Sequence, residues 1–333
     1  MSDKFKALIV NQEGENFTRE VKSIDKSFLK HGDVTVQVDY SDLNFKDGMI
    51  LKNGGRLVKE FPHIPGIDFA GKVLESENSK FKEGDEVILT GFRVGEIFYG
   101  GYSQIAKVNA DFLVKKPDNL TTKQAMILGT AGFTSLMSTF AIQARESILL
   151  GEKVNDVLVT GATGGVGSVA IMALTKLGYN VTAVTGKDSK SDYLKSLGAK
   201  NIVNRAEFDK DPRLIDKGLW DGVVDTVGGK ILANAIVQTK PNGIIAVCGN
   251  ANNNELKTSV MPFMLRGIKL WGMDSANCSI KRREFIWGEA SNLIDFDLLE
   301  KSILTVGLEK LLETYPKILK GEISGRVLVD LNK

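Results

Sequence analysis

The first third of the chain alternates short runs of β-branched and apolar residues with turns that contain glycine or charged residues. Runs of this kind, partly alternating between apolar and polar positions, are typical of strands. We expect strands at 5–10, 34–40, 67–75, 85–90 and 102–108. Their close spacing predicts a β-rich domain of the barrel or sandwich type.

The pattern changes at Thr121. Apolar residues recur at helical spacing over 121–144, and Thr121 or Thr122 is a suitable N-cap for that helix. Strand-like and helix-like segments then alternate up to residue 249. The expected strands are 157–160, 180–185, 201–203, 220–228 and 242–249. The expected helices between them are one that follows the glycines and ends at about 176, then 189–198 and 229–239. This alternation predicts right-handed βαβ units and a parallel sheet that is covered on both faces.

The end of the chain mixes both patterns. Residues 268–275 read as one more strand, 280–320 as mainly helical, and 325–331 as a final strand. A terminal strand of that kind can return to the N-terminal β domain.

Composition and charge are those of an ordinary globular protein. A chain of 333 residues is long enough for about two domains. With 43 Lys and Arg against 41 Asp and Glu, the net charge of +2 argues against a nucleic-acid binder with a broad basic field. The two cysteines, Cys248 and Cys278, are too few for a disulfide framework and fit a reducing compartment.

No segment is a convincing signal or membrane anchor. Asp3, Lys4 and Lys6 precede any apolar run that would qualify as a signal sequence. Residues 157–175 are uncharged over a length that raises the question of a membrane helix, but the clustered glycines make a poor spanning helix. We therefore expect a cytoplasmic protein that contacts no membrane and no nucleic acid.

Glycines cluster in the turn that connects the strand at 157–160 to the following helix. They can be read as Gly161-x-x-Gly164-x-x-Gly167 or as Gly165-x-Gly167-x-x-Ala170. A glycine-rich turn in this position exposes backbone N–H groups and the positive end of a helix, which suits a pyrophosphate. We interpret the turn as a dinucleotide site; the alternative is a tight turn without a ligand.

The end of the next strand indicates which dinucleotide binds. An NAD site usually has Asp or Glu there, whereas this chain has Thr185, Gly186 and Lys187. A threonine followed by a lysine attracts the 2′-phosphate of NADPH. Asp188 is the one negative charge nearby that would repel a 2′-phosphate, and it lies past the end of the strand. NADPH is the predicted cofactor, although Lys187 would also suit a solvated helix start.

Metal chemistry is not expected from the residue counts. A catalytic zinc needs three Cys, His or carboxylate ligands, and a structural zinc needs four, mostly Cys. The chain has two histidines, His31 and His63, and two cysteines, both late in the sequence. No Cys/His cluster exists, so we predict a zinc-free protein.

At this point nine segments match a known family in order along nearly the whole chain. They are 40–49, 65–71, 83–91, 100–104, 126–135, 159–168, 225–229, 261–275 and 324–331. The chain resembles the medium-chain dehydrogenase/reductase superfamily, in its zinc-free quinone oxidoreductase group and the acryloyl-CoA reductase-like branch. The resemblance implies an α/β protein with a GroES-like β-rich catalytic domain over 1–121 and 291–333. It implies a Rossmann domain with a doubly wound parallel sheet over 122–290.

The resemblance also accounts for the missing metal and implies the cofactor site. Zinc-dependent relatives have Cys where Asn44 stands and His-Glu where Ile67-Asp68 stand. The implied NADPH contacts are Tyr40, Thr163, Gly164, Gly165, Val166, Thr185, Gly186, Lys187, Arg205, Asn250, Met264 and Ser275. Relatives often have Arg where Lys187 stands, and a lysine cannot bind phosphate bidentately. We therefore expect Arg205 to contribute more than Lys187 to the selectivity for NADPH. The alternative for Arg205 is an ordinary surface arginine.

The expected chemistry is hydride transfer from NADPH to an activated carbon–carbon double bond of an acryloyl-CoA-type substrate. Fixed donors must then stabilise the developing enolate, and Tyr40 and Asn44 are the candidate catalytic residues. Reduction of quinones is the first alternative and an NADPH-binding sensor without turnover is the second. Arg93, in a glycine-rich loop, faces either an acidic part of the substrate or only solvent. The strand at 268–275 predicts a homodimer through sheet extension.

Overall fold

The structure is a computed structural model that describes residues 4–333. The chain forms two compact units. The β-rich unit contains the chain up to Thr130 together with Ser275–Ser291 and Leu299–Lys333, and the α/β unit contains Ala131–Asp274 and Asn292–Leu298. The boundaries differ from the domains expected from the sequence, because residues 122–130 and 275–290 pack within the β-rich unit.

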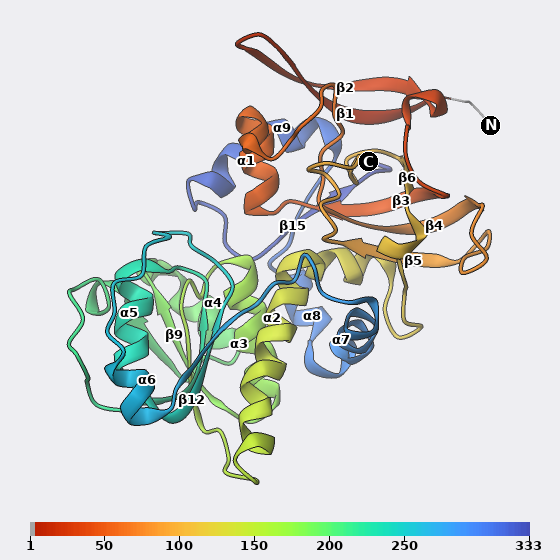
Figure 1. Ribbon diagram of the computed structural model, residues 1–333. Coiled ribbons are helices and arrows are strands. Elements are labelled where there is room, and N and C mark those ends of the chain that lie inside the picture. The colour runs from red at the N-terminus through yellow and green to blue at the C-terminus, as the bar shows by residue number, and fades with distance from the viewer. Residues whose placement is uncertain (1–3) are drawn as a thin grey trace. The chain divides into compact units, whose positions relative to one another are not determined.

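The β-rich unit is built around a seven-stranded sheet with the order β14-β15-β3-β4-β5-β7 and with β6 also paired to β3 (Figure 1). The strands are β3 (Val34–Asp42), β4 (Asp68–Ser76), β5 (Glu86–Thr90), β6 (Ile105–Val108), β7 (Val114–Lys115), β14 (Leu304–Val306) and β15 (Val327–Asp330). Strand β15 runs antiparallel to β3, with Val329 opposite Ser41. The predicted return of the last strand to the first domain is therefore confirmed.

Several elements of this unit were not expected from the sequence, among them the short strands β7 and β14. Strand β1 (Lys4–Glu13) pairs with an unpredicted strand, β2 (Asn16–Asp25), in an antiparallel hairpin. Helix α1 (Phe45–Asn53) directly follows β3 and lies beside α9 (Leu308–Leu319) in Figure 1. The two helices approach so closely that a Cβ on Gly48 would lie 2.9 Å from the Ile318 side chain. Helices α7 (Ile280–Leu293) and α8 (Phe296–Glu300) complete this end of the chain.

Helix α2 (Thr122–Ile148) begins at the predicted N-cap. The Thr121 hydroxyl accepts a hydrogen bond from the Gln124 N–H (3.1 Å), and the Gln124 side chain accepts one from the Thr121 N–H (3.0 Å). This is a reciprocal capping box. The helix is long and apolar enough to cross a membrane, but 89% of its apolar stretch is buried inside the fold, as in a core helix.

The α/β unit contains a six-stranded parallel sheet with the order β10-β9-β8-β11-β12-β13. Its strands are β8 (Asp156–Val159), β9 (Asn180–Thr185), β10 (Asn201–Asn204), β11 (Trp220–Asp225), β12 (Thr239–Val247) and β13 (Lys269–Gly272). Its helices include α3 (Gly165–Lys176), α4 (Ser191–Ser196), α5 (Gly229–Val237) and α6 (Met261–Arg266). This is the strand order of the doubly wound Rossmann fold, so the predicted fold class is confirmed.

Both faces of this sheet are covered, as the apolar strands predicted. A Cβ on Gly222 of β11 would lie 2.7 Å from Ile142 of α2. The next residue, Val223, packs in a cluster with Ile231 and Leu232 of α5. Because successive residues of a strand point to opposite faces, α2 and α5 cover opposite sides of the sheet.

A buried histidine gives the β-rich unit a pH-dependent stability. His63 is 1% exposed, and its ring meets Tyr99 edge-on with centroids 5.4 Å apart. Burial lowers the pKa of His63 from 6.5 to about 4. Below pH 6.5 the unfolded chain binds a proton that the folded chain does not, so this stabilisation is lost as the pH falls toward 4.

We predict that His63→Leu removes this dependence. Between pH 7 and 4, the free energy of unfolding of the wild type should fall by about 3 kcal/mol more than that of the variant. Urea unfolding of both proteins at a series of pH values measures this difference. Taking the difference cancels the contribution of the buried carboxylates, which titrate in the same range. Two curves that stay parallel from pH 7 to 4 would show that the pKa of His63 is the same in the folded protein as in the unfolded chain.

Candidate active site

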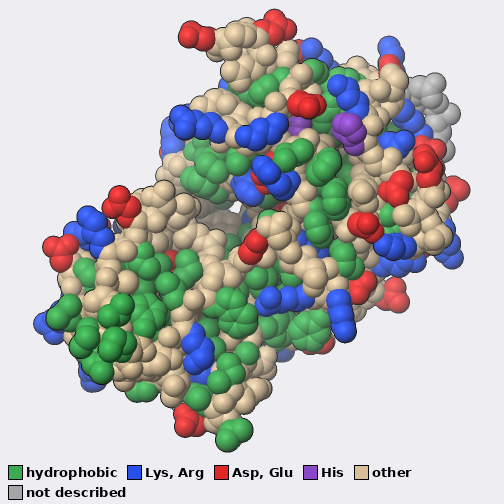
Figure 2. All heavy atoms as spheres, viewed as in Figure 1, with side chains coloured by type: hydrophobic (Ala, Val, Ile, Leu, Met, Phe, Trp, Pro, Cys, Tyr) green, Lys and Arg blue, Asp and Glu red, His purple; other side chains and the backbone are tan. Residues whose placement is uncertain are grey.

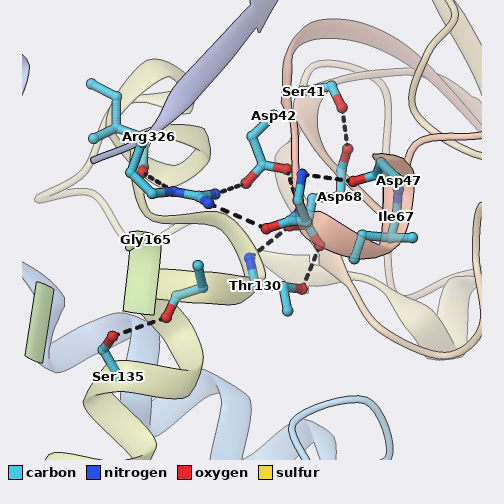
Figure 3. A network of polar contacts seen from close by, with 12 residues as sticks. Ser41, Asp42, Asp47, Ile67, Asp68, Thr130, Ser135, Gly165 and Arg326 are labelled. Carbon is cyan, nitrogen blue, oxygen red and sulfur yellow. Dashed lines mark hydrogen bonds and ion pairs between the residues drawn. The ribbon is translucent and has the colours of Figure 1, made fainter. Parts of the chain in front are cut away.

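The end of β3, the start of α1 and the start of β4 bring three buried carboxylates into one cluster (Figure 3). They belong to Asp42, Asp47 and Asp68, and each of these residues is 0% exposed. Asn44 is the N-cap of α1 and donates hydrogen bonds to Asp42 and Asp68, so the predicted catalytic amide sits inside a polar network.

The Asn44 side chain uses all of its hydrogen-bonding groups within this network. Its Nδ2 donates to Asp42 Oδ1 (2.7 Å) and to Asp68 Oδ2 (2.9 Å). Its Oδ1 accepts from Arg326 Nη1 at 3.2 Å. An amide has only two N–H hydrogens, so a substrate oxygen bound here would have to replace one of the carboxylates. This geometry favours a positioning role for Asn44, and its predicted catalytic role stays a prediction.

Arg326 supplies the positive charge of the cluster. The residue is 3% exposed; its Nη2 forms an ion pair with Asp42, and its Nε donates to the Ile127 carbonyl at 3.1 Å. The pKa of Asp42 is raised well above its ordinary value, first by burial and then by the neighbouring Asp68, while Arg326 acts in the opposite direction. The guanidinium therefore compensates a carboxylate that has no access to water.

Asp47 and Asp68 tie separate segments together. Asp47 accepts from the Asn44 N–H (2.9 Å) and from the Ile67 N–H (3.0 Å), and burial raises its pKa to about 7. Asp68 accepts from both the N–H and the hydroxyl of Thr130, each at 2.6 Å. The two carboxylates thus fix the loop that holds Asn44 and the start of β4 against helix α2.

Asn44 and Asp68 stand where the family resemblance implies zinc ligands in zinc-dependent relatives, and the hydrogen bonds of Asn44 do not fit a metal. The Asn44 amide points its N–H groups, not an electron pair, at both carboxylates. Within residues 4–333 no group of three or more His, Cys, Asp or Glu residues is arranged to hold a metal ion. Hydrogen bonds and one ion pair hold this part of the fold together.

Tyr40 lies two residues before Asp42 on β3, and therefore on the same face of that strand. It pairs with Ala70 of β4 and Asp330 of β15 and is half-buried. Burial, with a smaller effect of the Asp330 carboxylate, raises the pKa of Tyr40 above its ordinary value. The phenol is therefore a neutral hydroxyl that can donate a hydrogen bond at physiological pH.

The glycine turn has the geometry expected of a pyrophosphate site. Gly161 has φ of 59°, and a Cβ on Gly167 would lie 2.5 Å from the Gly161 carbonyl oxygen. Helix α3 begins at Gly165, and no side chain caps it at Gly164. The first-turn N–H groups are thus available to an anion. Thr163 and Val166 lie in the same turn, as predicted, and Ser135 on α2 donates to the Val166 carbonyl at 2.5 Å.

The predicted 2′-phosphate residues converge at the end of β9. A Cβ on Gly186 would lie 2.6 Å from Arg205 Nε, so the exposed guanidinium lies directly against Gly186. The Thr185 hydroxyl accepts from the Lys187 N–H at 3.0 Å, and burial lowers the pKa of Lys187. The carboxylate of Asp188, the negative charge in this region, accepts a hydrogen bond from the Asn204 amide at 2.9 Å. Arg205 and Lys187 therefore present two cations at one strand end.

The remaining predicted contacts are spread more widely. Asn250 is exposed just after β12, beside Gly228, and Met264 is 70% exposed on α6. Ser275 belongs to the β-rich unit, where its carbonyl accepts from Arg283 at 2.7 Å. Their contacts with the nicotinamide stay predictions.

The sequence interpretation missed the partners that hold Asn44 in place. Asp42 was seen only as part of the matching segment 40–49, Thr130 as part of a helix, and Arg326 as part of the strand at 325–331. An arginine at the edge of an apolar strand was the available signal, because a buried charge requires a partner.

Comparison with known proteins places the chain among oxidoreductases. Residues 30–118 match the alcohol dehydrogenase GroES-like domain, and residues 165–291 match the zinc-binding dehydrogenase domain. Acrylyl-CoA reductase AcuI of Ruegeria pomeroyi is 45% identical over 98% of this chain and 99% of its own length. YhfP of Bacillus subtilis, whose name assigns it to the quinone oxidoreductases, is 41% identical over 99% of this chain and 100% of its own.

Solved structures agree with this placement. The yhdH oxidoreductase of Salmonella enterica, solved with NADP, has a TM-score of 0.93 at 41% identity and covers 98% of this chain and 99% of its own. YhfP of Bacillus subtilis, solved with NAD bound, also has a TM-score of 0.93, at 40% identity, and covers 99% of this chain and 100% of its own. The two structures therefore hold different dinucleotides on closely similar folds.

Proposed function

The chain belongs to the medium-chain dehydrogenase/reductase family, in the branch that contains acrylyl-CoA reductase AcuI and YhfP, and we propose that it is an NADPH-dependent reductase of activated carbon–carbon double bonds. Its substrate is a small enoyl thioester of the acryloyl-CoA type. The observation that carries the proposal is the 45% identity to AcuI over nearly the whole of both chains. The glycine turn and the cationic strand end at Gly186 support it.

NADPH held at the glycine turn and at the end of β9 would supply a hydride. Addition of a hydride to the β-carbon moves the electron pair of the double bond toward the thioester oxygen and gives an enolate. A proton from water then completes the saturated thioester. The neutral Tyr40 hydroxyl is the proposed donor to the developing oxyanion, in keeping with its raised pKa. Asn44 is proposed to fix the end of β3, because its amide binds both Asp42 and Asp68.

A quinone reductase is the alternative that a specific observation favours, because YhfP carries that name. It would use the same hydride donor with a flat aromatic acceptor. Initial rates of NADPH oxidation with acryloyl-CoA and with a panel of quinones separate the two. We expect kcat/KM for acryloyl-CoA to be higher by orders of magnitude. A preference for quinones would overturn the proposed substrate, and tight NADPH binding without any turnover would point to a sensor.

The choice of NADPH over NADH rests on Arg205 and Lys187, and we predict its loss in their alanine variants. A hydrogen bond to a charged group contributes about 1.5–3 kcal/mol, so each change should raise KM for NADPH roughly 10-fold to 100-fold. Arg205→Ala should have the larger effect, because a guanidinium binds phosphate bidentately. KM for NADH, which lacks the 2′-phosphate, should stay as it is, and Lys195→Ala, at an exposed lysine further along α4, is the matched control. Equal changes with NADH and NADPH would refute this assignment.

We propose that the protein is a homodimer in the cytoplasm, formed through the edge of the α/β sheet. Strand β13 is a sheet edge with Leu270 and Trp271 exposed by 39% and 42%. Met264 and Leu265 on α6 extend the apolar surface, and Figure 2 shows hydrophobic side chains gathered where Figure 1 places that helix. An exposed edge of this kind pairs readily with another copy.

Trp271→Glu should convert the dimer to a monomer in sedimentation velocity experiments, because the introduced carboxylate would be buried in the interface along β13. Leu214→Glu, at an apolar residue that is 70% exposed elsewhere in the same unit, should leave the dimer intact. A wild-type mass that stays monomeric across a wide range of concentrations would refute the dimer.

A further inference from the structure

The loop between β5 and β6 has an unusual backbone in the β-rich unit. Two consecutive residues that are not glycine, Phe92 and Arg93, have φ of 52° and 61°. Side chains rarely adopt this left-handed conformation, which costs of order 1 kcal/mol or more per residue. Such strain persists only where the surroundings impose it, and it occurs often at ligand-binding sites.

Phe92 is held in this conformation from several sides. Its ring stacks on Phe112 with centroids 5.1 Å apart and an interplanar angle of 11°. The guanidinium of the buried Arg283 lies 4.4 Å from the ring centroid, and the Phe92 N–H donates to the Ala276 carbonyl at 3.0 Å. The direction in which Arg93 leaves the backbone is therefore fixed by the fold.

Arg93 shares one buried carboxylate with a lysine of α1. Glu96 is 6% exposed; one of its oxygens binds Lys46 Nζ at 2.7 Å, and the other lies 3.6 Å from Arg93 Nε. The side chains of Lys46 and Arg93 remain 36% and 47% exposed. Two cations around one carboxylate leave a net charge of +1, and the cationic groups are the ones that reach solvent.

The position of this pair relates it to the proposed active site. Lys46 lies in the first turn of α1, two residues after Asn44, and the intervening Phe45 is 46% exposed. Figure 2 shows basic side chains gathered over the part of this unit where Figure 1 places α1. An anionic group carried by a substrate bound near Asn44 would meet these cations.

We propose that Lys46 and Arg93 form an anion site that binds the phosphate groups of a CoA thioester, with Glu96 as the positioning residue. This inference rests on the proposed function and adds a determinant of substrate choice. An ordinary surface ion pair contributes little and requires neither a buried carboxylate nor a strained backbone. A guanidinium and an ammonium that are held together bind phosphate well. The site would favour a CoA thioester over an uncharged quinone.

The test compares two enoyl thioesters, acryloyl-CoA and acryloyl-N-acetylcysteamine, of which the second lacks the phosphates together with the rest of CoA beyond the cysteamine. In Lys46→Ala and Arg93→Gly, KM for acryloyl-CoA should rise about 10-fold each, in line with the loss of one charge-assisted contact. Kinetics with acryloyl-N-acetylcysteamine, and KM for NADPH, should be unchanged. Lys52→Ala, at the other end of the same helix, is the matched control. Arg93→Gly also relieves the left-handed backbone, so its thermal midpoint should not fall.

Calorimetric binding of propionyl-CoA to the wild type and the same variants reports on the site without turnover. Weaker binding in Lys46→Ala and Arg93→Gly supports the anion site even if no thioester is reduced, in which case only the proposed function fails. If KM for acryloyl-CoA and the affinity for propionyl-CoA are the same in wild type and variants, the anion site is refuted and the proposed function stands. A rise in KM for NADPH instead would assign the cations to the cofactor.

Discussion

Gly129→Ala should abolish stable folding of the β-rich unit. Gly129 lies inside helix α2 with φ of 52° and ψ of −157°, a combination that is essentially restricted to glycine. A methyl group there would overlap with the Asp42 carboxylate and would lie 2.8 Å from Arg326 Nη2. Backbone strain and displacement of a buried ion pair together should cost about 5 kcal/mol, which is comparable to the total stability of many domains.

The matched control is Gly14→Ala. Gly14 also has a left-handed φ, of 60°, but a Cβ on it would meet nothing within 4 Å. Its substitution should cost only about 1 kcal/mol from the backbone conformation. Chemical denaturation, or the soluble yield if the variant does not fold, measures both. An unfolding free energy for Gly129→Ala within 1 kcal/mol of that for Gly14→Ala would contradict the packing described around Asp42.

The second large effect is expected at Arg326. Arg326→Leu leaves the Asp42 carboxylate buried without its cation, and breaking one partner of a buried pair typically costs about 3–5 kcal/mol. The guanidinium also binds Asn44 and the Ile127 carbonyl, so a lysine cannot replace it fully. Arg326→Lys should therefore lie between the leucine variant and the wild type.

A double-mutant cycle with Asp42→Asn isolates the ion pair. Each single substitution leaves one uncompensated buried charge, whereas the double variant leaves neither. The double variant should be clearly more stable than the sum of the two single losses predicts, by about 1–3 kcal/mol. Additive losses in urea unfolding would show that Arg326 and Asp42 do not interact as an ion pair.

The sequence predicted most of the Rossmann half of the fold because its signals are local. Each buried parallel strand is a short apolar run. Gly161 and Gly167 mark a turn, and the strand before it and the helix after it can both be recognised within a few residues. The end of β9 was equally informative, because Thr185, Gly186 and Lys187 are adjacent in the chain. The approach of Arg205 to Gly186, implied by family resemblance, is a contact that the structure shows directly.

The elements that were missed depend on distant partners. Helix α1 contains Gly48, which weakens a helical pattern, yet a side chain there would collide with Ile318 and Leu319 of α9. Strand β2 has alternating half-buried positions among charged residues, and only pairing with β1 reveals it. Asp42 and Arg326 are 284 positions apart, so no local pattern could join them.

The central claim is that this chain delivers a hydride from NADPH to the β-carbon of an enoyl thioester. The most direct measurement uses NADPH deuterated at the transferable C4 position, acryloyl-CoA and the purified protein, with mass spectrometry and NMR of the product. We predict propionyl-CoA with one deuterium at C3 and a solvent-derived hydrogen at C2. Deuterium at C2, or acryloyl-CoA that remains unreduced while NADPH is bound, would contradict the account.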